Sequence, residues 1–430
     1  MSYVHPRAAV LSIGDELLIG QVVNSNAAWM GAALTDKGFR VMRHLSVGDD
    51  EDAIAAALDQ CLSDAEVVVI CGGLGPTDDD LTLRSVARHL KRGLRVDQNW
   101  VAHIEKFFRS RGREMAPSNV RQGEVPEGAE LLPNPSGTAP GIWVELTTED
   151  ATGPAHAGKV LALTPGVPYE MMEIMEQEIL PRLAPRAKGC AIFHRTLHTA
   201  GLGESQLAQM ISGTRTMLTP SLKLAYLPHF GEVRLRITAE AENSVRAEGD
   251  AAPLEFFLRQ KLEHHLYGAD GDTLELAVIR LLRERKATIA VAESCTGGLI
   301  NNRFTNVPGS SQILHGGIIT YANVVKTAEL GVPAELFTTV GAVSEEVARA
   351  MAEGVRRKFS ATIGLAVTGI AGPDGGTPEK PVGTVWIAVC DGKGTVARKV
   401  ICEQDRLRNK ERFTTAALNS VRLRLLGKLS

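Results

Sequence analysis

Residues 308–326, PGSSQILHGGIITYANVVK, place two serines, a tyrosine and a lysine in one short stretch of chain. A serine hydroxyl attacks a carbonyl carbon only when a neighbouring base takes its proton. His315 is the only histidine after residue 268, so the sequence offers one candidate histidine for a Ser-His-Asp triad in this part of the chain. A lysine can replace the histidine when burial keeps its amine neutral, and the apolar residues before Lys326 favour that form. Tyr321 could then relay a proton or hold the lysine in place.

The turn AESCTGG ends an apparent strand and opens an apparent helix. Ser294 and Thr296 offer hydroxyls, and we expect Gly297 and Gly298 to leave backbone amides accessible to an anion or an oxyanion. Cys295 suggests a cysteine nucleophile, but no aspartate–histidine pair is evident to activate it, and buried cysteines are commonly inert.

A glycine- and proline-rich loop, VTGIAGPDGGTPEKPVGTV, occupies residues 367–385, and Thr368 lies at its entrance. Backbone amides of such a loop can wrap a ribose phosphate. Each residue also has a plainer interpretation. A single loop serine is usually a turn or cap residue, Lys326 could be an exposed helix lysine, and His315 is more often a packed or surface residue.

The turn GGLGPTDDD covers residues 72–80. Its glycines Gly72, Gly73 and Gly75 let the backbone approach a ligand closely, and the helix start that follows favours phosphate. Three consecutive aspartates would repel a phosphate unless a divalent cation lies between them, and oxygen ligands suit magnesium or a similar hard ion. Asp79 or Asp80 could instead be only a helix N-cap.

Three further polar turns follow in the same part of the chain: SIGDELLIG (12–20) with Asn24 and Asn26 after it, NPSGTAPG (134–141) and TPGVPYEM (164–171). In a doubly wound sheet the carboxyl ends of the strands form the ligand crevice, so we expect these turns to converge there. Taken alone, Glu16 could be a solvated helix residue.

The elements that must position these residues alternate between strands and helices. Strand patterns at 7–13, 65–73 and 159–166 alternate with helix patterns at 26–38, 80–90 and 169–183, which predicts a mostly parallel sheet covered on both faces. Period-2 segments at 193–201 and 232–241 and a helix at 254–268 predict a small α+β part.

A second α/β unit follows. We expect helices at 273–286, 344–359 and 405–426 and strands at 287–294, 361–369 and 383–389, with Ser344 as an N-cap. The fold class is therefore α/β, with domains at 1–184 (doubly wound sheet), 185–268 (α+β connection) and 269–430 (α/β).

The composition excludes several classes of protein. The 430 residues are 44% hydrophobic and 23% charged, which fits globular domains with real cores. A net charge of −3 and 5% aromatic residues argue against a general nucleic-acid binder. We see no membrane-length apolar run and no signal-peptide pattern, and the six cysteines show no CxxC spacing. We expect a cytoplasmic protein with small-molecule substrates, and a homodimer on general grounds.

The motifs GDELLIGQVVNSN, GGLGPTDDD, NPSGTAPG and TPGVPYEM resemble the molybdopterin-binding-like domain of the CinA (competence/damage-inducible protein A) family. That resemblance implies a metal-dependent ADP-ribose pyrophosphatase. It implies that Asp79 and Asp80 hold the divalent metal, magnesium or a similar ion. It also implies nucleotide or phosphate contacts from Asn24, Gly73, Thr77 and Thr138, and water activation by Glu16 or Glu170.

AESCTGG, PGSS, the Tyr-x4-Lys pair and TGIAGPDGGTPEKPVGTV resemble the C-terminal domain of the same family, a nicotinamide-nucleotide amidase. The resemblance implies hydrolysis of nicotinamide mononucleotide (NMN) to nicotinate mononucleotide and ammonia, with no cofactor. On it, Ser311 is the nucleophile, Lys326 the base and Tyr321 the assistant, while Ser294 and Thr368 bind substrate or stabilise the oxyanion. The other expected substrate-binding residues are Thr296, Gly297, Gly298, Gly372, Gly376 and Arg406. Either serine motif could supply the nucleophile.

One segment departs from the family pattern. The family usually has Gly-Asp-Arg before its last helix, whereas this chain reads EQDRLRNKER, which keeps Arg406 as a phosphate partner but lacks the glycine. Two alternatives to a two-activity enzyme remain open at this point. One is a nucleotide-sensing or competence-related binding protein with inactive sites, and the other is molybdopterin adenylyl transfer by the first domain.

Overall fold

A computed structural model of the chain describes residues 4–429. The chain divides into two compact units. One unit runs to Phe193 and includes Ala239–Asp250, and the other comprises His194–Thr238 and the residues from Ala251 onward.

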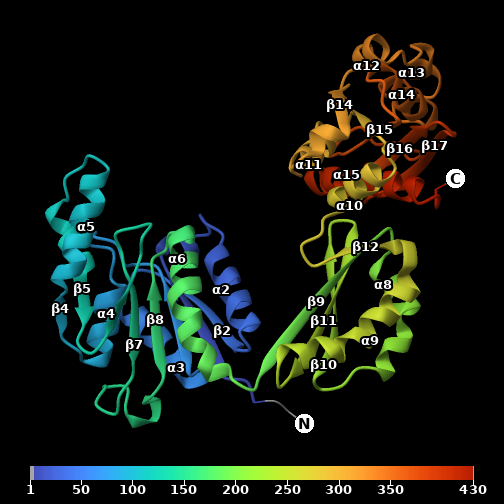
Figure 1. The fold of residues 1–430 in the computed structure, drawn as a ribbon. Helices are drawn as coiled ribbons and strands as arrows, with labels where there is room; N and C mark the ends of the chain where they lie inside the picture. Colours follow the sequence, from blue (N-terminus) through green and yellow to red (C-terminus); the bar gives the residue numbers. More distant parts are fainter. Residues whose placement is uncertain (1–3, 430) are drawn as a thin grey trace. The chain divides into compact units, whose positions relative to one another are not determined.

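The first unit is built on a six-stranded sheet in the order β2-β1-β3-β8-β7-β6 (Figure 1). Its strands are β1 (Arg7–Ile13), β2 (Arg40–Val47), β3 (Val67–Cys71), β6 (Glu130–Leu132), β7 (Gly141–Glu145) and β8 (Val160–Thr164). Strands β2, β1, β3 and β8 run parallel, and β7 and β6 are antiparallel at one edge. The predicted mostly parallel sheet is confirmed.

Helices cover both faces of this sheet. Successive strand residues point to opposite faces. Leu11 and Ile70 pack in one core with α3 (Glu51–Asp64) and α4 (Thr82–Leu90). Val10 and Val69 pack in a second core with α2 (Ser25–Asp36) and α6 (Pro168–Ile174). Burial on both faces explains why these strands read as continuous apolar runs.

The unit has further helices and strands outside these two cores. After α6 the helix continues through a π-helical turn, Met175–Ile179, into α7 (Leu180–Leu183). The others are α1 (Asp15–Leu18), β4 (Leu94–Val96), α5 (Gln98–Ser110) and β5 (Glu124–Pro126).

The connecting region has a four-stranded sheet in the order β10-β11-β9-β12, as expected of an α+β part. Its elements are β9 (Ala191–Ala200), α8 (Glu204–Met210), β10 (Leu222–His229), β11 (Glu232–Ala241), α9 (Ser244–Leu262) and β12 (Leu266–Ala269). The predicted helix at 254–268 is wrong at both ends. The helix begins ten residues earlier, at Ser244, and ends at Leu262, because the segment after it pairs antiparallel with β9.

The last sheet has the order β14-β13-β15-β16-β17, of which the first three strands are parallel. These strands are β13 (Ile289–Glu293), β14 (Leu314–Ile319), β15 (Ile363–Gly369), β16 (Thr384–Asp391) and β17 (Gly394–Ile401). Helices α10 (Leu274–Glu284), α11 (Leu299–Thr305) and α15 (Arg406–Leu425) share one core with the sheet.

The opposite face packs against α14 (Glu345–Lys358), with α12 (Asn323–Leu330) and α13 (Glu335–Thr339) alongside it. Ser344 caps α14 as predicted, since its Oγ accepts a hydrogen bond from the Val347 amide at 3.3 Å. No helix within residues 4–429 is long and apolar enough to cross a membrane.

Candidate active sites

Lys326 lies in the first turn of α12, just beyond the carboxyl end of β14. Its side chain is buried, with 1% of the residue exposed. Its Nζ lies 2.8 Å from the Thr320 carbonyl oxygen, 3.1 Å from that of Tyr321 and 3.2 Å from Ser294 Oγ. Burial lowers the pKa of the Lys326 amine below its ordinary value of 10.5. Among the described residues, no carboxylate forms an ion pair with it.

The three partners of Lys326 Nζ are all oxygen acceptors, which a protonated amine satisfies with its three N–H donors. A neutral amine has two N–H donors and one lone pair. When Lys326 is neutral, its two N–H groups can still donate to the two backbone carbonyls, and its lone pair can accept the hydrogen of the Ser294 hydroxyl. A serine hydroxyl that donates to such a lone pair can lose its proton as it attacks, which is the task of a general base.

Ser294 directly follows β13, and its amide donates a 3.1 Å hydrogen bond to the Val367 carbonyl of β15. It is 8% exposed. Because β13, β14 and β15 are parallel, their carboxyl ends meet at one edge of the sheet. That edge brings together Ser294, Lys326 and Thr368, whose Oγ1 donates to the Ala342 carbonyl at 2.8 Å.

The structure does not bring Ser311 to this edge. Ser311 is exposed in a one-turn 3₁₀ helix, Ser310–Gln312, at the amino end of β14, and neither of its serines lines the cavity that holds Lys326. The six residues of β14 lie between the two positions, a separation of roughly 20 Å. The expected pairing of Ser311 with Lys326 is therefore corrected, and the serine within reach of the amine is Ser294.

A buried carboxylate occupies the place where we expected an anion. Glu293 is fully buried, and its Oε2 accepts the Gly298 amide at 2.9 Å. The Gly297 amide donates to the Ser294 carbonyl at 3.2 Å. The prediction that these two amides bind a ligand anion is wrong, because the protein satisfies them internally. Glu293 also accepts bonds from the Ile300 amide and from the amide and side chain of Asn301, and so fixes the turn after Ser294.

The cavity at this edge has a volume of ≈ 250 Å³. Arg406 lies at its border, where one guanidinium nitrogen donates to the Gly372 carbonyl at 2.6 Å and another to the Tyr321 hydroxyl at 3.1 Å. Tyr321 is 63% exposed. Its hydroxyl accepts the bond from Arg406, while its backbone carbonyl oxygen accepts a bond from Lys326. The other lining residues include Asn323, Thr368, Gly372, Asp374 and Gly375.

Besides Gly297 and Gly298, two more expected substrate-binding residues, Thr296 and Gly376, lie outside the cavity lining. Thr296 is fully buried, and its Oγ1 has no hydrogen-bond partner among the described residues. Gly376 adjoins the lining residue Gly375, but a Cβ there would meet the Val382 amide nitrogen at 2.8 Å. Gly376 therefore allows a close approach of the loop to Val382, and neither residue faces the cavity.

Asn409, which the sequence analysis missed, anchors the segment that lacks the family's glycine. Its buried Nδ2 donates to the Ala371 carbonyl at 3.0 Å and to the Gln404 carbonyl at 2.7 Å. The start of α15, which carries Arg406, is thereby tied to the 367–385 loop.

The alternative nucleophile and base fit the site poorly. Burial raises the pKa of the Cys295 thiol to about 12, which keeps it protonated and unreactive at neutral pH. His315 is an exposed residue of β14 whose Nδ1 lies 3.2 Å from the Phe359 carbonyl oxygen, and it does not line the cavity.

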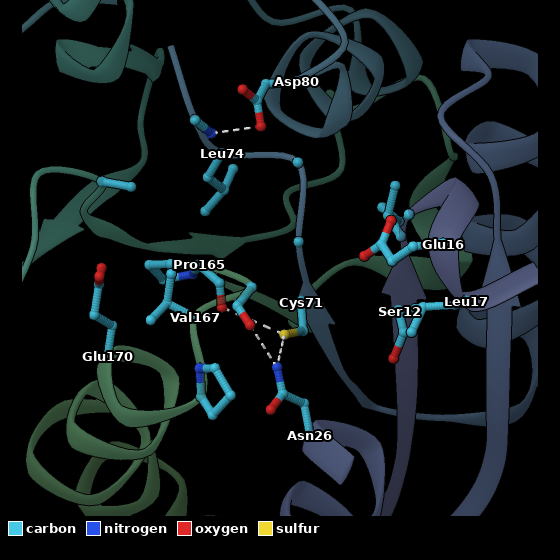
Figure 2. Close-up of a pocket in the computed structure, with 18 of the residues that line it drawn as sticks. Ser12, Glu16, Leu17, Asn26, Cys71, Leu74, Asp80, Pro165, Val167 and Glu170 are labelled. Carbon is cyan, nitrogen blue, oxygen red and sulfur yellow. Dashed lines mark hydrogen bonds between the residues drawn. The ribbon is translucent and has the colours of Figure 1, made fainter. Parts of the chain in front are cut away.

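The first unit has a larger cavity, ≈ 540 Å³, at the carboxyl ends of β1, β3 and β8 (Figure 2). All four predicted turns contribute to its lining, from Ser12 and Glu16 through the 72–80 turn to Thr138 and the 165–170 segment. The convergence expected of a doubly wound sheet is therefore observed.

Asp80 is engaged mainly with its own loop. Its Oδ1 accepts the Gly75 amide at 2.7 Å, and its Oδ2 accepts the amide of Thr77 at 2.9 Å and the hydroxyl of Thr77 at 2.5 Å. Both carboxylate oxygens thus hold the glycine turn in shape, and Asp80 borders the cavity in Figure 2. Thr77 does not line this cavity, so its expected contact with a ligand is not supported.

Three further carboxylates line this cavity. Partial burial raises the pKa of Asp49, and the charges of Asp15, Glu16 and Asp79 raise it further. Glu16, Asp49 and Asp79 all line the cavity. Asp49 was not predicted from the sequence. It lies just after β2, the strand next to β1 in the sheet. Within residues 4–429, no group of three or more histidine, cysteine, aspartate or glutamate side chains already has the arrangement of a metal site.

Other expected ligand residues have structural partners. Asn24 caps α2, since its Oδ1 accepts the Ala27 amide at 3.0 Å. Glu170 is buried and accepts a 2.7 Å bond from Asn134 Nδ2, which holds the 134–141 turn. Gly73 has φ +63°, and a Cβ there would lie 2.2 Å from Thr82 Oγ1, so glycine is required. All three nevertheless line the cavity.

Two polar atoms at this cavity have no hydrogen-bond partner in the described part of the chain: Ser12 Oγ and Asn26 Oδ1. The amide group of Asn26 is held in place, because its Nδ2 donates to the Gly166 carbonyl at 2.7 Å (Figure 2). Buried polar atoms are normally paired, so these two are candidates for contact with a bound ligand.

Three family models match the chain in succession. A probable molybdopterin binding domain matches residues 9–185, the damage-inducible protein CinA KH domain matches 194–268, and the CinA C-terminal domain matches 271–425.

Relatives match almost the whole length of the chain. A CinA-like protein of Salinibacter ruber is 42% identical over 416 residues, or 97% of this chain and 98% of that protein. A CinA-like protein of Chloroherpeton thalassium is 43% identical over 419 residues, which cover 96% of this chain and 98% of that protein. A solved structure titled as the protein CinA with unknown function, from Thermoplasma acidophilum, is 33% identical; it covers 42% of this chain and 98% of its own, with a TM-score of 0.37.

Proposed function

The chain belongs to the CinA family, and we propose that its C-terminal domain hydrolyses the carboxamide of NMN to give nicotinate mononucleotide and ammonia. One observation carries the proposal: the amine of Lys326 is buried without a carboxylate partner among the described residues and lies 3.2 Å from Ser294 Oγ. Buried lysines of this kind serve as bases, not as surface charges.

In the proposed mechanism, Ser294 Oγ attacks the carboxamide carbon while its proton passes to Lys326 Nζ. The tetrahedral intermediate collapses when the carbon–nitrogen bond breaks. Lys326 gives its proton to the departing nitrogen, which leaves as ammonia, and an ester remains on Ser294. Water then attacks the ester, Lys326 takes the water proton, and that proton returns to Ser294 Oγ as the acid is released.

Arg406 supports the nucleotide part of this assignment. It is the cavity-lining cation that has no role in the serine–lysine pair, and guanidinium groups bind phosphate through two parallel hydrogen bonds. The bonds to Gly372 and Tyr321 hold the guanidinium at the border of the cavity. A substrate that combines a carboxamide with a phosphate would use both ends of the site.

The pH dependence of the reaction follows from the lysine. Only neutral Lys326 can accept the proton, so kcat/KM for NMN should rise with pH and level off above the lysine's pKa. Burial lowers that pKa below 10.5, so the midpoint of the rise should lie below pH 10.5. Initial rates of ammonia release between pH 6 and 10 measure the profile. A rate that is independent of pH, or that falls as the pH rises, would contradict the assignment of Lys326.

A second proposal concerns the cavity of the first unit: hydrolysis of ADP-ribose to AMP and ribose 5-phosphate. It is supported by the cavity volume of ≈ 540 Å³, the unpartnered Ser12 Oγ and Asn26 Oδ1, and the carboxylates of Glu16, Asp49 and Asp79. The oxygen donors and the raised pKa of Asp49 fit a divalent cation, which would neutralise pyrophosphate oxygens and acidify water when bound. Glu16, Asp49 and Asp79 do not form a metal site as they stand, so their carboxylates would have to draw together to hold it, while Asp80 shapes the turn.

Chelation should separate the two activities. EDTA is expected to abolish AMP formation from ADP-ribose, whereas ammonia release from NMN should continue unchanged, because the serine–lysine mechanism uses no metal. Asp79→Asn should lower the rate of ADP-ribose hydrolysis by roughly tenfold or more and leave the rate of ammonia release from NMN unchanged. Asp78→Asn is the matched control, since Asp78 lies outside the cavity and pairs with Arg121. ADP-ribose hydrolysis that persists in EDTA would refute the metal assignment.

The binding-protein alternative has a distinct signature. A nucleotide sensor with inactive sites would bind ADP-ribose or NMN tightly and release neither AMP nor ammonia. Turnover and binding measured on the same preparation distinguish it from the enzyme.

A further inference from the structure

Asp374 is the only acidic side chain that lines the described cavity around Ser294 and Lys326. It follows Gly372 in the glycine-rich loop and is exposed. In the described part of the chain, no cation forms an ion pair with its carboxylate and no donor hydrogen-bonds to it. The mechanism proposed above gives it no task.

The cavity therefore presents three different electrostatic regions. Arg406 supplies a positive charge at the border, the serine–lysine pair is neutral in its reactive form, and Asp374 supplies a negative charge. A complementary substrate carries an anion, an uncharged carboxamide and a cation. NMN has this pattern, since its phosphate is anionic and its N-glycosylated pyridine ring is a permanent cation.

We propose that Asp374 is a specificity-determining residue that selects carboxamides borne on a positively charged ring, by placing its carboxylate against the pyridinium of the nucleotide. The inference rests on the proposed amidase function and goes beyond it: the site discriminates by ring charge as well as by phosphate and amide. Opposite charges across a binding site give specificity as well as affinity.

The loop that carries Asp374 is anchored on one side, which makes such a role possible. Asn409 Nδ2 binds the Ala371 carbonyl at 3.0 Å, and Arg406 binds the Gly372 carbonyl at 2.6 Å. The phosphate-binding arginine and the carboxylate are therefore positioned through the same stretch of loop. A ligand that spans from Arg406 to Ser294 would lie in the same cavity as the Asp374 carboxylate.

The 1,4-dihydro form of NMN isolates ring charge from all other features. It has the same carboxamide, ribose and phosphate, but its ring is neutral. Dissociation constants of both compounds should be measured by calorimetry with the full chain carrying Ser294→Ala, which prevents turnover, and with the Ser294→Ala/Asp374→Asn double variant. Because the carboxylate is partly solvated, Asp374→Asn should weaken NMN binding by about five- to tenfold and change binding of the dihydro form by less than about twofold.

Glu379→Gln in the Ser294→Ala background is the matched control. Glu379 lies further along the same loop, is exposed and does not line the cavity, so its removal changes the net charge equally without changing the site. It should leave both dissociation constants unchanged. Equal weakening of both ligands by Asp374→Asn, or no weakening of either, would overturn the proposed charge selection.

Failure of the amidase proposal would give a different result from failure of the proposed role of Asp374. In that case the native chain releases no ammonia from NMN, and the Ser294→Ala chain binds neither form. Binding of NMN without any preference for the charged ring would instead leave the amidase intact and reject only the role of Asp374.

Discussion

Ser294→Ala is expected to lower kcat for NMN by roughly 10⁴-fold or more, because it removes the only hydroxyl among residues 4–429 that lies within hydrogen-bond reach of the Lys326 amine. The substitution should lower kcat and should leave substrate binding nearly unchanged. The hydroxyl forms a covalent bond during the reaction but contributes little to ground-state binding, and Arg406 remains in place. The dissociation constant for NMN should therefore change by no more than a few fold. Ammonia release and calorimetry on one preparation measure the two quantities.

Ser311→Ala provides the matched control. It makes the same chemical change in the other serine motif, at an exposed position on the amino side of β14. We expect it to retain activity within about twofold of the native chain, as exposed substitutions away from a site usually do. The opposite result, an inactive Ser311→Ala and an active Ser294→Ala, would reverse the assignment of the nucleophile.

Lys326→Met should also lower kcat strongly, by roughly 10³-fold or more, because no base then takes the Ser294 proton. Methionine fits an apolar environment, but it leaves the carbonyls of Thr320 and Tyr321 without their donor, at a cost of about 1–3 kcal/mol each. The free energy of unfolding, measured by urea titration, should fall by a corresponding amount. The kcat should be measured without urea and well below the temperature at which the variant unfolds.

Lys326→Arg separates the base from the structural donor. Arginine keeps hydrogen-bond donors at the position, but it stays protonated and cannot accept the serine proton. It should therefore be inactive even where it is folded at the assay temperature. An arginine variant with more than a tenth of native activity would show that proton transfer to this side chain is not required.

The architecture was largely predictable because its signals are local. Strands buried on both faces, such as β1 and β3, appear as continuous apolar runs, and the polar turns that follow them were expected to meet at one edge of the sheet. The helix at 254–268 failed for a partly non-local reason. Gly268 already disfavours a helix at Leu266–Ala269, and pairing with β9 makes the segment a strand.

The serine assignment failed because closeness in sequence does not give closeness in space. Ser311 is 15 positions before Lys326, but a whole extended strand lies between them. Ser294 is 32 positions away, yet it ends a parallel neighbour of that strand, so both side chains reach the same edge. The engagement of the Gly298 amide was equally hidden, since it depends on where the buried carboxylate of Glu293 points. The Gly297 amide closes a turn onto the Ser294 carbonyl instead.

Asp49 and Asn409 gave no recognisable signal in one sequence. Asp49 joins the carboxylates of Glu16 and Asp79 only because β2 lies beside β1. Asn409 is one polar residue on an amphipathic helix, and its role depends on the loop that it contacts.

The most direct test of the central claim is to incubate the native full-length chain with NMN in the presence of excess EDTA and to quantify ammonia and nicotinate mononucleotide together. The account predicts that the two products form in equal amounts and at the same rate as without chelator. NMN that remains intact under these conditions, with no ammonia above the protein-free control, would contradict it.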